Sequence, residues 1–261
     1  MLSRNRTTTR PPVFWWMLSF FFAITLYSIP INAGQGWIEV ADGIQYKKEV
    51  IFKMDFEKPP HGILHLFTID PAKYRLDIIT AKKLGMVNTD ARTMAKRSGA
   101  ILAINGGFFS PEFDSLGLLV SNGRELNKMK KISWWHVFKT EKGAPSVIAR
   151  DEYKASPDVE MAVEAGPRVL IGGIPAPKLK PSPAERTVIG TDKNGRIVIA
   201  VTERLSLTLM DLARYLRADG FTDILNLDGG SSTQLYAKFK GLEIDRQGLG
   251  LVANGVGVFP R

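Results

Sequence analysis

Cysteine is absent from the 261 residues, and histidine occurs only three times. Without cysteine the chain can form no disulfide and can use no thiol as a nucleophile or metal ligand. So few histidines, with no cysteine beside them, argue against a zinc site. The Gly-x-Ser-x-Gly motif is also missing, and no Ser-His-Asp set can be read from the chain. The sequence therefore gives no support to thiol, zinc or serine hydrolase chemistry.

Acidic residues are fewer than basic ones, which gives a formal net charge of +9. Arg4, Arg6 and Arg10 supply three of these charges, so residues 34–261 carry 9 − 3 = +6. A modest basic excess suits an anionic substrate or surface. No Lys/Arg block has aromatic residues interleaved with it, so nucleic acid is not an expected partner. With 44% hydrophobic and 23% charged residues, the composition is that of an ordinary globular protein.

Residues 1–33 have the pattern of an export signal. Three arginines precede the apolar stretch Val13–Ile29, Pro30 interrupts it, and Ala33 offers a small residue before a cut at Gly34. This pattern predicts a signal peptide and a periplasmic or secreted protein. The alternative is an uncleaved N-terminal anchor, because about 17 apolar residues is the lower limit for a membrane-spanning helix. Membrane contact is expected only through this segment, if it is retained.

Residues 34–261 are expected to form one domain, because no internal repeat or long linker divides them. Thr89 is expected to cap a helix that runs through Ser98, and Thr208 to cap a second helix that ends at Gly220. Alternating apolar residues and turn signals predict strands elsewhere. These strands are expected at 44–54, 61–69, 74–80, 100–104, 116–120, 124–127, 134–138, 160–164, 186–190, 196–202, 223–227, 236–239 and 250–259. The expected fold class is α+β, a single domain with a mixed β-sheet core and a few flanking helices.

Two predicted strands end in a polar residue and a pair of glycines, Asn105-Gly106-Gly107 and Asp228-Gly229-Gly230. Paired glycines at a strand end can turn backbone N–H groups toward a ligand without a Cβ clash. Asn105 can both donate and accept, while Asp228 can act as base, nucleophile or metal ligand. Ser231 and Ser232 add hydroxyl groups beside it. The alternative is that both segments are ordinary turns, for which Asn and Asp-Gly are common.

Other polar residues near strand ends are candidates for the same site. Arg186 offers a planar set of donors suited to phosphate, although a surface ion pair would also explain it. Glu164 or Glu203 could partner Asp228, since hydrolysis of sugar bonds commonly uses two carboxylates. His136, in an aromatic-rich strand, is a candidate for a sugar-binding wall, the alternative being a half-buried structural histidine.

Taken together, five segments resemble the phosphodiester glycosidase family, and they stand in that family's order. The resemblance covers roughly residues 60 to 260 and is closest to a short exported bacterial branch. A third glycine often follows the Asp-Gly-Gly of family members, where this chain has Ser231, and Thr202-Glu203-Arg204 stands where many members have Asp-Gly. The five segments are Asn105-Gly106-Gly107-Phe108-Phe109, Gly166-Pro167-Arg168-Val169-Leu170, Arg186-Thr187-Val188-Ile189-Gly190, Leu227-Asp228-Gly229-Gly230-Ser231-Ser232 and Val252-Ala253-Asn254-Gly255-Val256-Gly257-Val258-Phe259.

This resemblance implies an α+β fold with the motifs around one cleft, and hydrolysis of a sugar–phosphate diester in a glycan or cell-envelope polymer. Asp228 would act at the anomeric carbon, Arg186 would hold the phosphate, and Asn105 and Ser231 would orient the sugar. No cofactor is assigned, and a divalent cation at Asp228 is left open because no ligand set can be read. A non-catalytic module that binds anionic glycans and hydrolysis at the P–O bond are the alternatives. The other expected substrate-binding residues are Gly106, Gly107, Gly229, Gly230, Ser232, Glu164 and His136.

Overall fold

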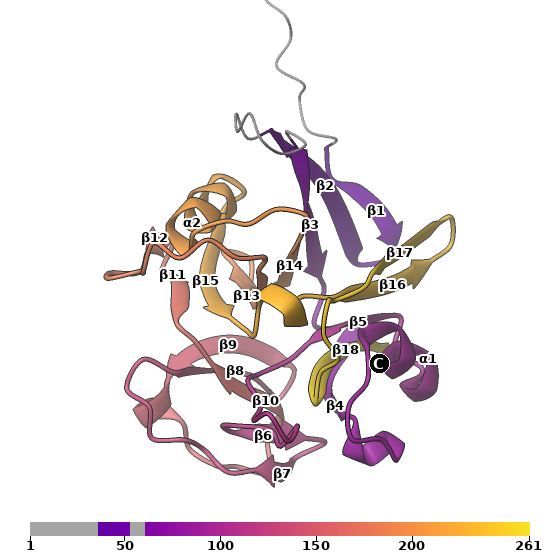
Figure 1. Cartoon of the computed structure of the whole chain (residues 1–261), viewed down its shortest axis with the longest axis vertical. Coiled ribbons are helices and arrows are strands. Elements are labelled where there is room, and N and C mark those ends of the chain that lie inside the picture. The colour runs from indigo at the N-terminus through magenta and orange to yellow at the C-terminus, as the bar shows by residue number, and fades with distance from the viewer. Residues whose placement is uncertain (1–35, 53–60) are drawn as a thin grey trace, which may run out of the picture. The chain divides into compact units, whose positions relative to one another are not determined.

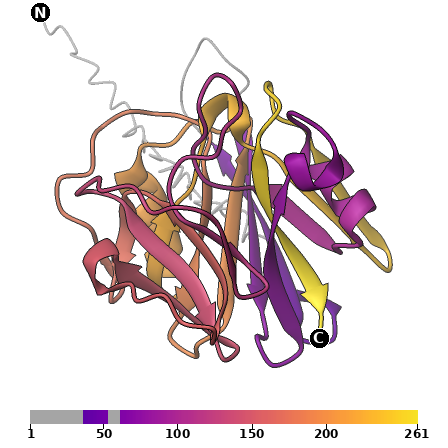
Figure 2. The same cartoon turned by 90° about the horizontal axis from the view of Figure 1, so that it is seen from below.

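The computed structural model describes residues 36–52 and 61–261, which build three antiparallel β-sheets and two α-helices. The predicted signal peptide or anchor lies outside the described residues, as does the end of the strand expected at 44–54. Figure 1 shows the three sheets as separate regions that face a common centre, and Figure 2 shows the same arrangement from below.

The largest sheet has eight strands and supplies the strand that leads to Asp228. Its neighbours are joined by antiparallel pairs, with Ile189 of β13 opposite Leu225 of β15. In spatial order the strands are β1 (Ile38–Ala41), β2 (Ile44–Phe52), β3 (His61–Ile69), β14 (Ile197–Glu203), β13 (Thr187–Asp192), β15 (Phe221–Asn226), β11 (Arg168–Ile171) and β12 (Ile174–Pro175).

Two five-stranded sheets complete the architecture, and one of them carries Asn105 at the end of a central strand. The first consists, in order, of β7 (Arg124–Asn127), β6 (Leu119–Ser121), β10 (Val159–Ala165), β8 (His136–Glu141) and β9 (Ala144–Ala149). The second consists of β17 (Leu242–Arg246), β16 (Leu235–Phe239), β5 (Leu102–Asn105), β18 (Asn254–Pro260) and β4 (Tyr74–Thr80).

One apolar core lies between the inner faces of all three sheets. Phe67 and Leu225 come from the largest sheet, Phe138 from the second, and Ile104 and Val256 from the third, and all five side chains are fully buried. Successive side chains of a strand point to opposite faces, so each sheet also has an outer apolar face. The two helices each cover one such outer face.

The longer helix, α2 (Leu209–Ala218), packs Leu212, Ala213 and Leu216 on the outer face of the largest sheet, beside β11 and β15 (Figure 1). The predicted cap is confirmed, since Thr208 Oγ1 accepts a hydrogen bond from the backbone N–H of Asp211 at 3.1 Å. A side-chain acceptor at this position satisfies one of the free N–H groups of the first turn.

The other helix, α1 (Ala91–Ser98), covers the outer face of the sheet that contains β5 and β18. Its cap lies one residue later than predicted. Asp90 Oδ1 accepts from the N–H of Thr93 at 2.8 Å, whereas Thr89 forms a bridge with Val252. Gly99 ends the helix in the left-handed conformation, as expected.

The expected α+β class is confirmed only in part: helices and strands both occur, but strands dominate the structure. The expected mixed sheet is wrong: every strand pair among residues 36–52 and 61–261 is antiparallel. Five strands in the described part of the chain were also missed: β1, β9, β11, β12 and β17. Pro145 lies in β9 and Pro175 in β12, which are both edge strands, and proline lowers the expectation of a strand.

Gly190 tests the close pairing of β13 with β15. A Cβ at this position would lie 1.9 Å from the carbonyl oxygen of Asp223, which is backbone and cannot rotate away. We expect Gly190→Ala to lower the free energy of unfolding by about 2–3 kcal/mol, because the strands must separate locally. Gly36→Ala is the control, since a Cβ added there would have nothing within 4 Å. Denaturant unfolding that shows equal stability for both variants would contradict this packing.

Candidate functional site

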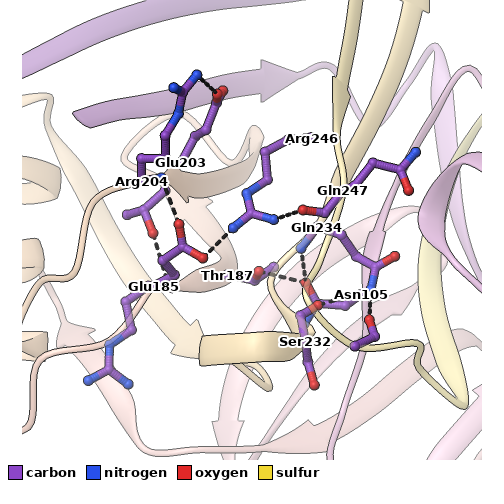
Figure 3. Close-up of polar contacts among 12 residues, drawn as sticks. Asn105, Glu185, Thr187, Glu203, Arg204, Ser232, Gln234, Arg246 and Gln247 are labelled. Carbon is purple, nitrogen blue, oxygen red and sulfur yellow. Dashed lines mark hydrogen bonds and ion pairs between the residues drawn. The ribbon is translucent and has the colours of Figure 1, made fainter. Parts of the chain in front are cut away.

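The side chain of Asn105 joins the segments that the sequence singled out. It is fully buried at the end of β5. Its Nδ2 donates to the carbonyl oxygen of Asp228 at 2.7 Å. Its Oδ1 accepts from Thr187 Oγ1 at 2.6 Å and from the N–H of Gln234 at 3.1 Å (Figure 3). The amide is thus used within the protein. Asn105 positions the Asp228 segment, which corrects the expectation that it orients a sugar directly.

Backbone contacts bring the other motif segments to the same place. The N–H of Gly106 donates to the carbonyl of Asn254 at 3.0 Å, and the carbonyl of Gly106 accepts from the N–H of Asp228 at 3.1 Å. Asn226 Nδ2 donates to the carbonyl of Gly166 at 3.1 Å. With the Thr187 contact, four of the five segments are joined directly, and the Gly166 segment is joined through Asn226, the residue before Leu227.

Three of the paired glycines, Gly106, Gly107 and Gly229, are closely packed, whereas Gly230 has open space where a Cβ would lie and a left-handed backbone with φ of 61°. A Cβ at Gly106 would lie 2.2 Å from Asn254 Oδ1, and one at Gly229 would lie 2.8 Å from the carbonyl oxygen of Glu185. The N–H groups of Gly106, Gly229 and Gly230 all have partners inside the protein. The expectation that these N–H groups face a ligand is therefore corrected. Gly107 is also tightly packed, since its Cβ would lie 3.1 Å from a backbone carbonyl oxygen.

Asp228 follows β15 and is partly buried. The N–H of Gly229 donates to its Oδ1 at 2.9 Å, and the hydroxyl of Ser232 is also hydrogen-bonded to its carboxyl group. Burial raises the pKa of Asp228 above its usual value, while these two hydrogen bonds act in the opposite direction. A partly desolvated carboxylate that keeps two donors is suited to act as a base or nucleophile.

Arg186 lies across the strand pair from Asp228. Val188 pairs with Asn226, and Leu227 donates its N–H to the carbonyl of Thr187 at 2.9 Å. Continuing this antiparallel register by one step places the backbones of Arg186 and Asp228 opposite each other, while the guanidinium and the carboxylate each bond to other groups.

The guanidinium of Arg186 is held by backbone carbonyls. Its Nε donates to Leu207 at 3.1 Å, and its Nη2 donates to Ser182. Burial lowers its pKa below the usual value. Among the described residues it has no carboxylate within ion-pair distance. Its positive charge is therefore not neutralised by an internal acid, which suits the predicted role of holding an anion.

Glu164 does not join this region. Its side chain is fully buried and projects from the outer face of β10, opposite to the face where Val163 and Ala165 enter the central core. Its Oε2 accepts from the N–H groups of Leu118 and Lys130, each at 2.8 Å. Glu164 thus holds two loop segments in place, and the expectation that it binds substrate or partners Asp228 is corrected.

His136 begins β8 and is half-buried. Its Nδ1 lies 3.3 Å from the carbonyl oxygen of Trp134, and burial is the main cause that lowers its pKa, which favours the neutral imidazole at neutral pH. Trp134 is 51% exposed and makes edge-to-face contacts with Trp135 and Phe108. This aromatic surface packs against Gly166. A role for His136 in a sugar-binding wall stays a prediction.

A cavity of about 660 Å³ opens beside Ser231, and we call it the Ser231 pocket. Glu185 lies in its wall, where its Oε1 accepts from the N–H of Arg204 at 2.6 Å and its Oε2 accepts from Arg246 (Figure 3). The pocket is lined by Ala184, Glu185, Glu203, Arg204, Ser206, Gly230, Ser231, Asp245, Arg246, Gln247 and Leu249. The sequence analysis did not predict a site role for Glu185. Successive side chains of an extended segment point to opposite sides, so Glu185 and its neighbour Arg186 face different ways. Arg246 was missed because β17 was not predicted.

Glu203 also lines the Ser231 pocket, and a buried chain of hydrogen bonds supports it. Its Oε2 lies 3.0 Å from His65 Nε2, and His65 Nδ1 lies 2.9 Å from the hydroxyl of Tyr46. The hydrogen bond with His65 is the largest cause that lowers the pKa of Glu203 to about 2, so this carboxylate is ionised at neutral pH. Glu203 is therefore an acceptor in the pocket wall, and its ionised form makes it unsuited to act as a general acid.

Two further observations concern metals and membranes. Within residues 36–52 and 61–261, no group of three or more His, Cys, Asp or Glu side chains is placed to hold a metal ion. In the same part of the chain, no helix is long and apolar enough to cross a bilayer.

The fold and the site define a class of antiparallel β protein in which glycine-paired strand ends from different sheets converge beside a carboxylate. The family model of the phosphodiester glycosidases matches residues 98–259, and the chain belongs to this family. The chain is also 27% identical over 149 residues to the uncharacterized protein YigE of Escherichia coli (strain K12). That alignment spans 52% of this chain and 58% of YigE, so it leaves a large part of the relative unmatched.

Solved structures share the fold at low sequence identity. The catalytic domain of zebrafish N-acetylglucosamine-1-phosphodiester alpha-N-acetylglucosaminidase, auto-inhibited by its pro-peptide, has a TM-score of 0.68 and 14% identity over 87% of each chain. A protein from Synechocystis has a TM-score of 0.57 and 16% identity, over 86% of this chain and 63% of that one. A candidate exported protein from Burkholderia pseudomallei K96243 has a TM-score of 0.53 and 14% identity, over 77% and 74% of the two chains.

Removing the amide of Asn105 tests its positioning role. We expect Asn105→Ala to lower the free energy of unfolding by about 2–4 kcal/mol, because it leaves three buried polar groups without their partner. Asn194→Ala is the matched control at an exposed turn, and its stability should stay within about 0.5 kcal/mol of the parent. Denaturant unfolding measures both. An Asn105→Ala protein as stable as the parent would show that the amide does not hold the segments together.

Proposed function

We propose that this protein hydrolyses the glycosidic bond of a sugar–phosphate diester in a glycan or cell-envelope polymer, with Asp228 acting at the anomeric carbon. The observation that supports this most is the position of Asp228, a partly buried carboxylate at the junction of the five family segments, with Arg186 across the strand pair. Membership of the phosphodiester glycosidase family agrees with this chemistry.

The proposed reaction breaks the bond between C1 of the sugar and the phosphate oxygen. The electron pair of that bond leaves with the phosphate, and an oxygen from water ends on C1. A phosphodiester anion is a weak base, so it needs little protonation as it departs. The protein must instead stabilise negative charge on the phosphate, for which Arg186 is suited, and positive charge on the sugar ring, for which ionised Asp228 is suited. Asp228 serves as the nucleophile or as the base for water.

A non-catalytic module that binds an anionic glycan is the second candidate. The exposed Trp134 and the basic balance of residues 34–261 favour it, because aromatic rings stack on sugars and positive charge attracts anionic polymers. We place either activity outside the cytoplasm, on the basis of the export pattern in residues 1–33. Saturable binding of a teichoic-type polymer without any released sugar would favour this module.

Asp228→Asn provides the main test of the proposed hydrolysis. We expect kcat/KM for a panel of glycosyl phosphodiesters to fall at least about 1,000-fold, because the amide can act neither as nucleophile nor as base. The matched control is Asp151→Asn, at an exposed position away from the junction, which should keep the parent rate. Turnover by folded Asp228→Asn at the parent rate would contradict the catalytic role proposed for Asp228. Hydrolysis in ¹⁸O-labelled water should place the label on the sugar, whereas label on the phosphate would indicate P–O cleavage.

The pH dependence should reflect the environment of Asp228. Because burial raises its pKa, the ionised form is lost at a higher pH than for an ordinary aspartate, whose pKa is about 3.9. As pH falls, kcat/KM should decline through this raised pKa. Ser232→Ala removes a hydrogen bond that favours the ionised form, so the acid limb should move to still higher pH. Profiles of kcat/KM for both proteins measure this, and a limb that moves to lower pH in Ser232→Ala would contradict it.

A further inference from the structure

The Ser231 pocket is separate from the chemistry assigned to Asp228 and Arg186, yet it begins close to Asp228 in the chain. Its walls come from residues 184–185, 203–206, 230–231 and 245–249, which belong to four separate parts of the chain. A volume of about 660 Å³ falls within the range of small-molecule sites. The pocket therefore has the size and the position to hold part of a substrate.

One wall of the pocket is built around a buried ion pair. The side chain of Arg246 is only 8% exposed, and it donates to Glu185 and to the carbonyl of Gln247. The guanidinium of Arg246 is thus held in place by contacts inside the protein. The N–H of Arg204 holds the second oxygen of Glu185. These contacts fix the orientation of the Glu185 carboxylate.

Glu203 in the pocket wall is fixed by a different arrangement. His65 and Tyr46 lie behind it with exposed fractions of 3% and 4%, and they form a chain of two hydrogen bonds that ends at its Oε2. Its Oε1 accepts from Arg204 at 3.1 Å. An acceptor held from behind in this way keeps one geometry when a ligand arrives, which lowers the entropy cost of binding.

The charges of the pocket disfavour a phosphate. Each charged group of the lining has a partner of opposite sign. Glu185 pairs with Arg246 and Glu203 pairs with Arg204. The carboxylate of Asp245 pairs with Arg92, so no unpaired cation is left among the lining residues to bind a phosphate. A sugar hydroxyl both donates and accepts hydrogen bonds, so it matches a wall that mixes carboxylate acceptors with guanidinium, amide and hydroxyl donors.

One apolar side chain also borders the pocket. Leu249 is 89% exposed and offers an apolar contact for the carbon face of a ring. The lining as a whole therefore fits an uncharged, hydroxyl-rich ring better than it fits an anion.

We propose that the Ser231 pocket binds a neutral sugar unit of the substrate, next to the bond that is cleaved at Asp228. The carboxylates of Glu203 and Glu185 accept from its hydroxyl groups, and Gln247, Arg204 and the hydroxyl of Ser231 donate to it. His65 and Tyr46 act as positioning residues through Glu203. Naming the sugar as part of the substrate rests on the proposed function, but its binding does not.

Direct binding tests the pocket without relying on turnover. Saturation-transfer NMR titrations of the full-length protein would use the methyl glycosides of N-acetylglucosamine, glucose, galactose and mannose, with inorganic phosphate as the anionic comparison. At least one glycoside should bind, and Glu203→Gln should weaken it about 10-fold, because a charge-assisted hydrogen bond is lost. Gln247→Ala, at the pocket surface, should weaken glycoside binding about threefold. This variant replaces Glu203→Gln in the test if Glu203→Gln does not fold. Glu112→Gln, at an exposed position elsewhere, should bind like the parent.

Tyr46→Phe separates positioning from general structure, because Tyr46 is absent from the pocket lining. It should lower the free energy of unfolding, because His65 loses a buried partner, and in the folded protein it should weaken glycoside binding about two- to fivefold. Binding equal to the parent in Glu203→Gln and Gln247→Ala, or no binding of any glycoside, would overturn the proposal. So would phosphate that displaces the bound glycoside. If glycosides bind at the pocket but no glycosyl phosphodiester is hydrolysed, the proposed function is wrong and the pocket assignment stands. If glycosyl phosphodiesters are hydrolysed but no glycoside binds at the pocket, only the pocket assignment is wrong.

Discussion

The buried amide of Asn105 is the contact on which the arrangement of the site depends. One side chain bonds to the carbonyl of Asp228, the hydroxyl of Thr187 and the N–H of Gln234, which belong to three other segments. Since it has no exposed surface, water cannot replace any of these bonds when one is lost. The family segments are thus held at one point by a residue that is fully buried.

Around this point, the environments of the ionisable groups differ on the two sides of the Asp228 segment. Arg186 has no acidic partner among the described residues, whereas the charged groups that line the Ser231 pocket are all paired with groups of opposite sign. Burial raises the pKa of Asp228, and the hydrogen bond from His65 lowers that of Glu203. An anion is therefore favoured near Arg186 and a neutral, hydroxyl-rich group in the pocket. A substrate that joins a phosphate to a sugar has both features.

Local sequence signals predicted much of the secondary structure, because they act over a few residues. The strands at 61–69 and 74–80, the cap at Thr208 and the helix end at Gly99 follow from alternation and capping chemistry. The direction of strand pairing did not follow, since antiparallel partners such as β5 and β18 are far apart in the chain. The edge strand β9 was missed, because it contains Pro145 and its residues bury little surface.

By itself, the sequence determined the chemical groups at the site and their order: the family segments, the carboxylate of Asp228 and the guanidinium of Arg186. Only the tertiary structure decided which of these groups are buried and which residues line a pocket. Glu164 and Asn105 turned inward, because their hydrogen-bond partners come from distant segments. Glu185 and Arg246 turned toward a shared pocket, although 61 residues separate them in the chain. The reason is that strand alternation fixes a side chain's face locally, while what lies opposite that face depends on which sheets pack together.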